Sequence, residues 1–141
     1  MKTTELAPHP RIVFDGLKPM STPDNRSVIT VYLTRTDGKS FEGTCETEKS
    51  QTPRVKSAAR AALRALEAAA DGRVTFTLWR VAEISELNTV LVHLSISSPA
   101  GDNVLLLNGA GFVNGQPLHA AVKATLQATN RVLETGFIFI H

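Results

Sequence analysis

The sequence predicts an α+β fold made of two tandem βββα repeats related by a pseudo-twofold axis. Three observations support this: two alanine-rich helical segments, a period of two in the segments before them, and the same order of elements in both halves. Residues 58–67 (AARAALRALE) match residues 121–130 (AVKATLQATN) at an offset of 63. Neither half can enclose a core alone, so we expect antiparallel sheets covered by two helices in one compact domain.

Four parts of the chain are expected from the order of strands, helices and breakers. Residues 18–25 (KPMSTPDN) are rich in Pro, Ser and Thr, which predicts a loop between the first two strands. The expected parts are a flexible N-terminal tail (1–10), a first βββα repeat (11–71), a second βββα repeat (72–135) and a C-terminal strand (136–141).

The strands are predicted from apolar residues that alternate with polar ones. Ile29, Val31 and Leu33 show this period of two, which is typical of a half-buried strand. The following Asp37-Gly38 predicts a hairpin turn, because both residues tolerate positive φ. Trp79 aligns with Leu17, which favours packing over ligand stacking. The aligned strand pairs are 11–17 with 73–79, 28–35 with 89–96, and 41–46 with 107–112.

Each helix is predicted to have one apolar and one polar face. The first begins after Pro53, and glycine at 72 and 136 ends the two helices because it adopts the left-handed C-terminal conformation. The expected buried residues are Val55, Ala59, Ala62, Leu66 and Ala69 in the first helix, and Leu118, Val122, Thr125, Thr129 and Leu133 in the second.

Composition places the chain among ordinary globular proteins. Hydrophobic residues make up 43% and charged residues 20% of the 141 residues, and the net charge is only +2. The single cysteine, Cys45, has no internal partner for a disulfide. The sequence begins without an apolar leader and contains no run near the ~20 apolar residues that span a bilayer. We therefore expect a cytoplasmic protein with no membrane association.

Residues 109–133 resemble the end of the C-terminal regulatory domain of 2-isopropylmalate synthase and citramalate synthase. In that family a Gly-x-Gly strand end precedes a helix reading Ala-x-Ala-Lys-Ala-x-Leu-x-Ala-x-Asn-Arg-Leu. The family domain is itself two βββα units, so the resemblance covers the architecture of the whole chain. The synthases' catalytic barrel has no counterpart here. The matching residues are Gly109, Gly111, Lys123, Ala124, Leu126, Ala128, Asn130 and Arg131.

The resemblance implies a regulatory module that dimerises and binds a small metabolite such as an amino acid. In the family, leucine or isoleucine binds near the loops before the helices. That region corresponds here to residues 109–116, with a counterpart at 43–51. A structural or protein-interaction protein is the alternative, with Phe112 and Val113 filling the pocket. The expected ligand-binding or interface residues are Gly109, Gly111, Asn114, Gln116 and Asn130.

No catalytic or metal-binding motif is recognised, so we expect neither an enzyme nor a cofactor. Four single histidines, His9, His93, His119 and His141, lack metal-type spacing to one another and to Cys45. Cys45 alternates with Phe41 and Gly43, which favours a small buried residue over a nucleophile.

Basic residues at the start of the first helix leave RNA binding as a second alternative. A three-stranded sheet followed by such a helix resembles the double-stranded-RNA-binding domain, in which the helix start contacts phosphates. A solvated helix face is the interpretation we favour over a nucleic-acid partner. The residues concerned are Arg54, Lys56, Arg60 and Arg64.

The C-terminal segment Phe137-Ile138-Phe139-Ile140 predicts a strand that needs a sheet edge. That edge belongs either to the same chain or to a second copy, and both alternatives stay open. Together with the resemblance, this segment leads us to expect a homodimer.

Overall fold

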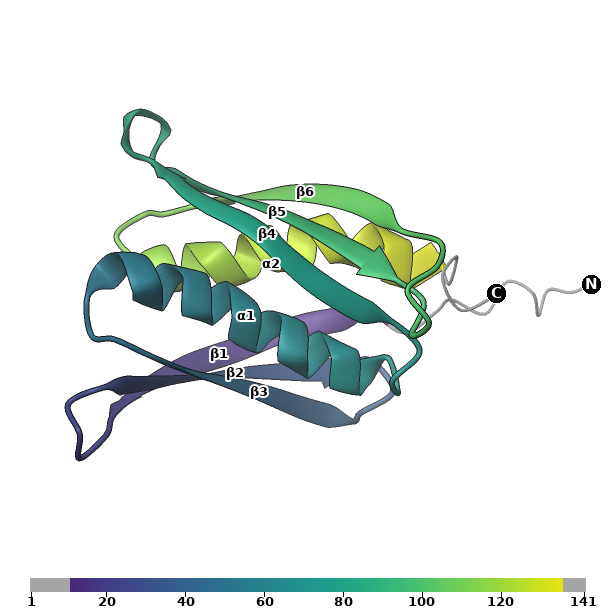
Figure 1. Ribbon diagram of the computed structural model, residues 1–141, viewed down its shortest axis with the longest axis horizontal. Coiled ribbons are helices and arrows are strands. Elements are labelled where there is room, and N and C mark those ends of the chain that lie inside the picture. Colours follow the sequence, from purple (N-terminus) through teal and green to yellow (C-terminus); the bar gives the residue numbers. More distant parts are fainter. Residues whose placement is uncertain (1–10, 136–141) are drawn as a thin grey trace, which may run out of the picture.

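The computed structural model describes residues 11–135, and Figure 1 shows its two repeats. The predicted tail (1–10) and C-terminal strand (136–141) lie outside the described residues. The predicted fold class is confirmed, because each half is an antiparallel three-stranded sheet followed by a helix. The first half contains β1 (Ile12–Ser21), β2 (Ser27–Arg35), β3 (Ser40–Thr47) and α1 (Gln51–Ala69). The second contains β4 (Thr75–Ile84), η2 (Ser85–Leu87), β5 (Thr89–Ser97), β6 (Leu105–Phe112) and α2 (Pro117–Thr135).

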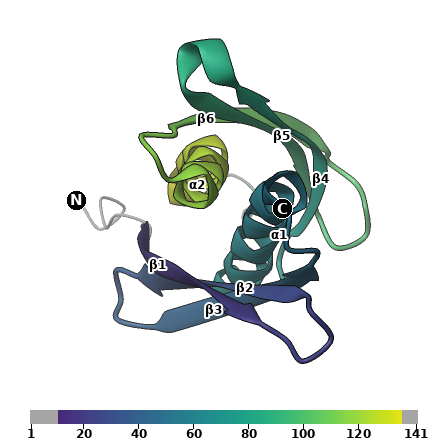
Figure 2. The same cartoon turned by 90° about the vertical axis from the view of Figure 1, so that its left-hand side faces the viewer.

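The two helices lie between the two sheets, as Figure 2 shows. Helix α1 packs mainly on β3 and β2 of its own sheet, and α2 packs mainly on β6 and β5. Each helix also contacts the first strand of the other half, α1 meeting β4 and α2 meeting β1, and the helices contact each other. The repeats are therefore interlocked around a shared core. We call the β1–β2–β3 sheet sheet A and the β4–β5–β6 sheet sheet B.

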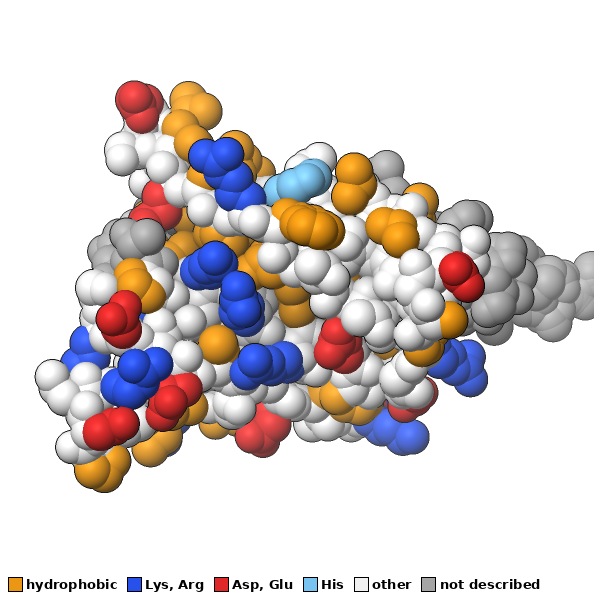
Figure 3. All heavy atoms as spheres, viewed as in Figure 1, with side chains coloured by type: hydrophobic (Ala, Val, Ile, Leu, Met, Phe, Trp, Pro, Cys, Tyr) orange, Lys and Arg blue, Asp and Glu red, His pale blue; other side chains and the backbone are white. Residues whose placement is uncertain are grey.

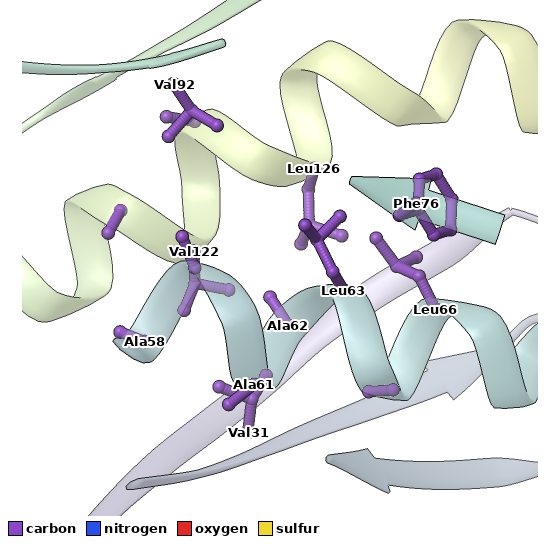
Figure 4. Close-up of a cluster of buried hydrophobic side chains, with 14 of the residues drawn as sticks. Val31, Ala58, Ala61, Ala62, Leu63, Leu66, Phe76, Val92, Val122 and Leu126 are labelled. Atoms are coloured by element: carbon purple, nitrogen blue, oxygen red, sulfur yellow. The ribbon is translucent and has the colours of Figure 1, made fainter. Parts of the chain in front are cut away.

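Alanines make close packing on α1 possible. Ala58, Ala61, Ala62 and Ala65 have no exposed surface, so α1 is covered on several sides rather than on one stripe. Figure 4 shows Leu63, Leu66, Phe76 and Leu126 grouped together, with Val122 further along the helix interface near Ala58. Of the predicted helix core, Leu118 is half-buried and the other residues with a described side chain are buried. No helix within residues 11–135 is long and apolar enough to cross a membrane.

The first strand of each half departs from the sequence alignment. β1 continues to Ser21, so only residues 22–26 form the loop predicted at 18–25. A bulge leaves Asp15 without a partner in β2, and a bulge in β4 does the same to Trp79. Trp79 therefore corresponds to Asp15 and not to Leu17. The prediction that Trp79 is packed inside was wrong, because its side chain is 59% exposed.

Arg35 joins the predicted Asp37-Gly38 hairpin to the end of α1. The hairpin forms, with Gly38 at φ 96° and the Gly38 N–H donating to the Arg35 carbonyl at 2.8 Å. The Arg35 guanidinium lies 2.9 Å from the Asp37 carboxylate and 3.6 Å from that of Asp71. Its Nη1 also donates to the carbonyl of Ala69 at 2.6 Å. A cation at a helix C-terminus is favourable because the last carbonyls carry partial negative charge.

Candidate functional site

The glycines predicted to bind a ligand lie against the backbone of α2. A Cβ built on Gly109 would lie 1.9 Å from the carbonyl oxygen of Ala124, and one on Gly111 would lie 2.1 Å from that of Ala120. Gly43 meets α1 in the same way, at 2.2 Å from the carbonyl oxygen of Ala61. These glycines allow each helix to approach its third strand, and this packing accounts for their identity.

The predicted polar ligand residues do not come together. Asn114 is exposed with φ 44°, and the carbonyl oxygen of Gln116 accepts from the Ala120 N–H at 3.0 Å, which starts α2. Asn130 lies 13 residues after Pro117 on the same helix, roughly 20 Å further along it. Phe112 does not fill a pocket at this loop, since its side chain is 68% exposed. The Oδ1 atom of Asn130 is buried and has no hydrogen-bond donor among the described residues.

Helix side chains instead satisfy the open edges of the sheets. Arg64 Nη1 donates to the carbonyl oxygen of Thr44 on β3, and at the equivalent place Gln127 Oε1 accepts from the Ala110 N–H on β6 at 2.6 Å. Glu67 Oε2 accepts from the Phe76 N–H on β4 at 2.8 Å. Asn130 occupies the α2 position equivalent to Glu67. These contacts explain several polar helix residues as edge caps, which block pairing with other strands.

The basic residues of α1 form one exposed stripe. Lys56, Arg60 and Arg64 follow at intervals of four, so they share a face of the helix, and all three are exposed. Arg54 is half-buried, and its Nε atom has no partner among the described residues. Figure 3 shows this face of the molecule. Since Arg64 already binds Thr44, the stripe is partly used by the fold itself.

Two of the four histidines and the cysteine lie within the described residues. Nδ1 of His93 lies 2.7 Å from Oδ1 of Asn108 on the outer face of sheet B, and the ring of His119 lies 5.7 Å from that of Phe14. Cys45 is buried. Within residues 11–135, no group of three or more His, Cys, Asp or Glu side chains is arranged to hold a metal ion.

The outer face of sheet B, which points away from the helices, carries four exposed large apolar side chains. Cross-strand rows on this face are Ala82–Leu91–Ala110 and Ile84–Thr89–Phe112, with the polar row Arg80–His93–Asn108 beside them. Leu106 and Trp79 extend the apolar surface beyond this polar row, on either side of Ser95. The Oγ atom of Ser95 accepts from the Trp79 indole N–H at 3.0 Å. The exposed fractions of its four large apolar side chains are 59% for Trp79, 43% for Leu91, 64% for Leu106 and 68% for Phe112.

The outer face of sheet A is the internal comparison, and it carries more charged and hydroxyl residues, beside the exposed Val13, Met20 and Tyr32. The registers fix which positions correspond, and an equivalent bond supports the match: Thr34 donates to Asp15 in the place where Trp79 donates to Ser95. At six positions, sheet A has a charged or hydroxyl residue where sheet B has an apolar one, and the reverse holds at three, where Val13, Val28 and Tyr32 correspond to Thr77, Thr89 and His93. The six pairs are Asp15 and Trp79, Lys18 and Ala82, Thr30 and Leu91, Ser40 and Leu106, Thr44 and Ala110, and Glu46 and Phe112.

A shallow hollow of about 580 Å³ lies in this outer face. Ala82, Ile84 and Leu91 form its apolar part, and Arg80 and His93 line its polar part. Sequence reasoning missed this face because alternation within a strand identifies the buried side but not the character of the other side. A position-by-position comparison of the repeats, with the bulges aligned, would have found it.

No protein-family model matches this chain, and no curated protein matches it significantly.

Proposed function

We propose that this protein is a non-catalytic association module that forms a homodimer through the outer face of sheet B. The observation that carries the proposal is the replacement of six polar residues of sheet A by apolar ones at the same positions of sheet B. Both sheets have the same fold and the same helix layer behind them. The exposed apolar residues of sheet B include the larger side chains of Trp79 and Phe112, and a second copy that covers this face would remove them from water.

The size of the apolar surface agrees with this role. With the exposed fractions given above, Trp79, Leu91, Leu106 and Phe112 present roughly 400–500 Å². That is more than half of the roughly 800 Å² that each partner buries in an interface of standard size. The polar row between the apolar ones supplies hydrogen-bonding groups that fix the orientation of the partner.

The resemblance to synthase regulatory domains supports dimerisation, because those domains dimerise. It would also imply a bound amino acid near residues 109–116. The geometry favours dimerisation over this ligand, since α2 closes Gly109 and Gly111 and Asn130 lies far from Asn114. RNA binding is favoured less, since Arg64 is committed to the carbonyl of Thr44.

The test transplants residues of sheet A into sheet B. Light scattering and sedimentation velocity over a concentration series give the mass of the 15.2 kDa chain and of a Leu106→Ser, Phe112→Glu variant. We expect a dimer for the wild type and a monomer with unchanged circular dichroism for the variant. Ser40→Ala with Glu46→Gln, at the same positions of sheet A, is the matched control and leaves the dimer intact.

Two outcomes refute the proposal. A wild type that stays monomeric at all concentrations would show that sheet B faces water or another molecule. A dimer that survives the sheet B substitutions would move the interface elsewhere. A chain ending after Gly136 is measured in parallel, because loss of the dimer in that chain alone would assign dimerisation to Phe137–Ile140.

A further inference from the structure

A groove lies between α1 and β4, on the helix side of sheet B and so opposite the proposed dimer face. Its volume is about 350 Å³. Leu63, Phe76 and Leu78 form an apolar floor, of which Leu63 and Phe76 are buried. Arg60, Arg64 and Glu67 line the helix wall. Figure 3 shows this hollow open to the viewer, with Lys and Arg side chains beside apolar ones.

The strand side of the groove is a sheet edge. β4 is the first strand in the order β4–β5–β6, and within residues 11–135 no strand pairs with its other side. Glu67 caps this edge at one point only, the Phe76 N–H. Beyond that point the edge runs past Leu78 and opens into the groove. Edge strands that are not covered are templates for pairing with an extended segment.

The charge of the groove favours an acidic occupant. Arg60 and Arg64 carry two positive charges against the single carboxylate of Glu67. Neither arginine forms an ion pair with a described residue, and Arg64 is held in place by its bond to a neutral carbonyl. Guanidinium groups bind carboxylates through charge-assisted hydrogen bonds, which are stronger than bonds between neutral groups.

The other half of the molecule again serves as an internal comparison. Lys123 and Gln127 stand on α2 where Arg60 and Arg64 stand on α1, so the arginine pair is unique to the first helix. Between α2 and β1 the ring of His119 packs on that of Phe14, with 5.7 Å between centroids. The α1–β4 groove has the two arginines on its wall and, among the described residues that line it, no aromatic ring from the helix packed over its floor.

We infer that the α1–β4 groove is a docking site for an extended acidic segment of a partner protein. The segment adds to the edge of β4 as a further strand, and its main chain pairs with β4. Alternate side chains enter the apolar floor, as expected for strand addition. Its carboxylates pair with Arg60, and Arg64, whose Nη1 is bound to the Thr44 carbonyl, adds positive charge to the groove wall. An RNA strand would use the cations but neither the strand edge nor the floor formed by Phe76 and Leu78.

The probe is a fluorescent, end-blocked octapeptide that alternates valine and glutamate, compared with one that alternates valine and lysine. Anisotropy titration of the full chain is expected to show binding of the acidic peptide only. Arg60→Ala weakens this binding roughly tenfold, the effect of losing one charge-assisted hydrogen bond. Lys56→Ala is the control, because it removes the same charge one turn away without lining the groove. We expect it to change the affinity less than twofold.

A second measurement reports on strand addition itself. Amide exchange by NMR is expected to slow at Leu78 on binding and to stay unchanged along β6. Absence of binding at about 1 mM acidic peptide, or equal binding of the lysine peptide, overturns the inference. The inference is also overturned if Arg60→Ala and Lys56→Ala weaken peptide binding equally and weaken binding of a uridine dodecamer by the same factor. The Leu106→Ser, Phe112→Glu variant binds the peptide normally, so failure here is distinguishable from failure of the dimer proposal.

Discussion

Gly109→Ala tests the close approach of α2 to β6. The new methyl carbon would lie 1.9 Å from the carbonyl oxygen of Ala124 and 2.8 Å from the amide nitrogen of Ala128. Ordinary contacts of this kind begin near 3.4 Å, so the helix must move away by about 1.5 Å. Both opposing atoms belong to the backbone, and no side chain can rotate to make room.

The expected cost is at the upper end for overpacked cores, about 3 kcal/mol. At this chain length that lowers the midpoint of thermal unfolding by about 10 °C. Urea denaturation followed by circular dichroism measures the free energy of unfolding. Thr44→Ser is the control, because Thr44 is the equivalent exposed residue of β3 outside the proposed dimer face, and it should change stability by less than about 0.5 kcal/mol. A loss below about 1 kcal/mol for Gly109→Ala would refute the reasoning.

Three further predictions concern polar contacts. Glu67→Ala should lower the free energy of unfolding by about 1 kcal/mol in urea denaturation and speed amide exchange at Phe76. Glu67→Gln keeps a hydrogen-bond acceptor and should cost less. Equal losses of stability in the two variants would contradict the role of the Phe76 bond. Asn130→Leu should raise stability by about 1 kcal/mol, because Oδ1 is buried without a donor among the described residues; a destabilised variant would contradict this. The hydrogen bond from Arg35 lowers the pKa of Asp37 below its usual 3.8. This contact therefore stabilises the fold above pH 3.8, and the contribution is lost as pH falls through the lowered pKa. Carboxyl NMR titration should show the Asp37 pKa rising in Arg35→Ala, and an unchanged titration would exclude Arg35 as the cause.

The fold could be predicted because the two repeats record it twice. Val31 and Val92 alternate with polar residues in the same way, and the helix faces repeat with the period that burial requires. Strand alternation and alanine content are local properties of the sequence, so they can be recognised without knowledge of the tertiary contacts.

The candidate site could not be predicted in the same way. A bulge adds one residue to each first strand, so Trp79 moved from an expected interior position to the exposed face of sheet B. Gly109 and Gly111 matched a ligand-binding pattern, but their role depends on the distance to α2, which no local pattern records. The α1–β4 groove joins residues of both repeats, and neither repeat alone contains its lining.

The crossed contacts of the two helices have a consequence for synthesis on the ribosome. Leu63 at the helix interface meets Leu126, and its surroundings stay incomplete until that residue has been made. At 5–20 residues per second, the interval between these two residues lasts roughly 3 to 13 s. During this time the nascent first half carries an uncovered apolar helix face. Because α1 is rich in alanine, that face exposes less hydrophobic surface to other chains than one built from larger apolar residues.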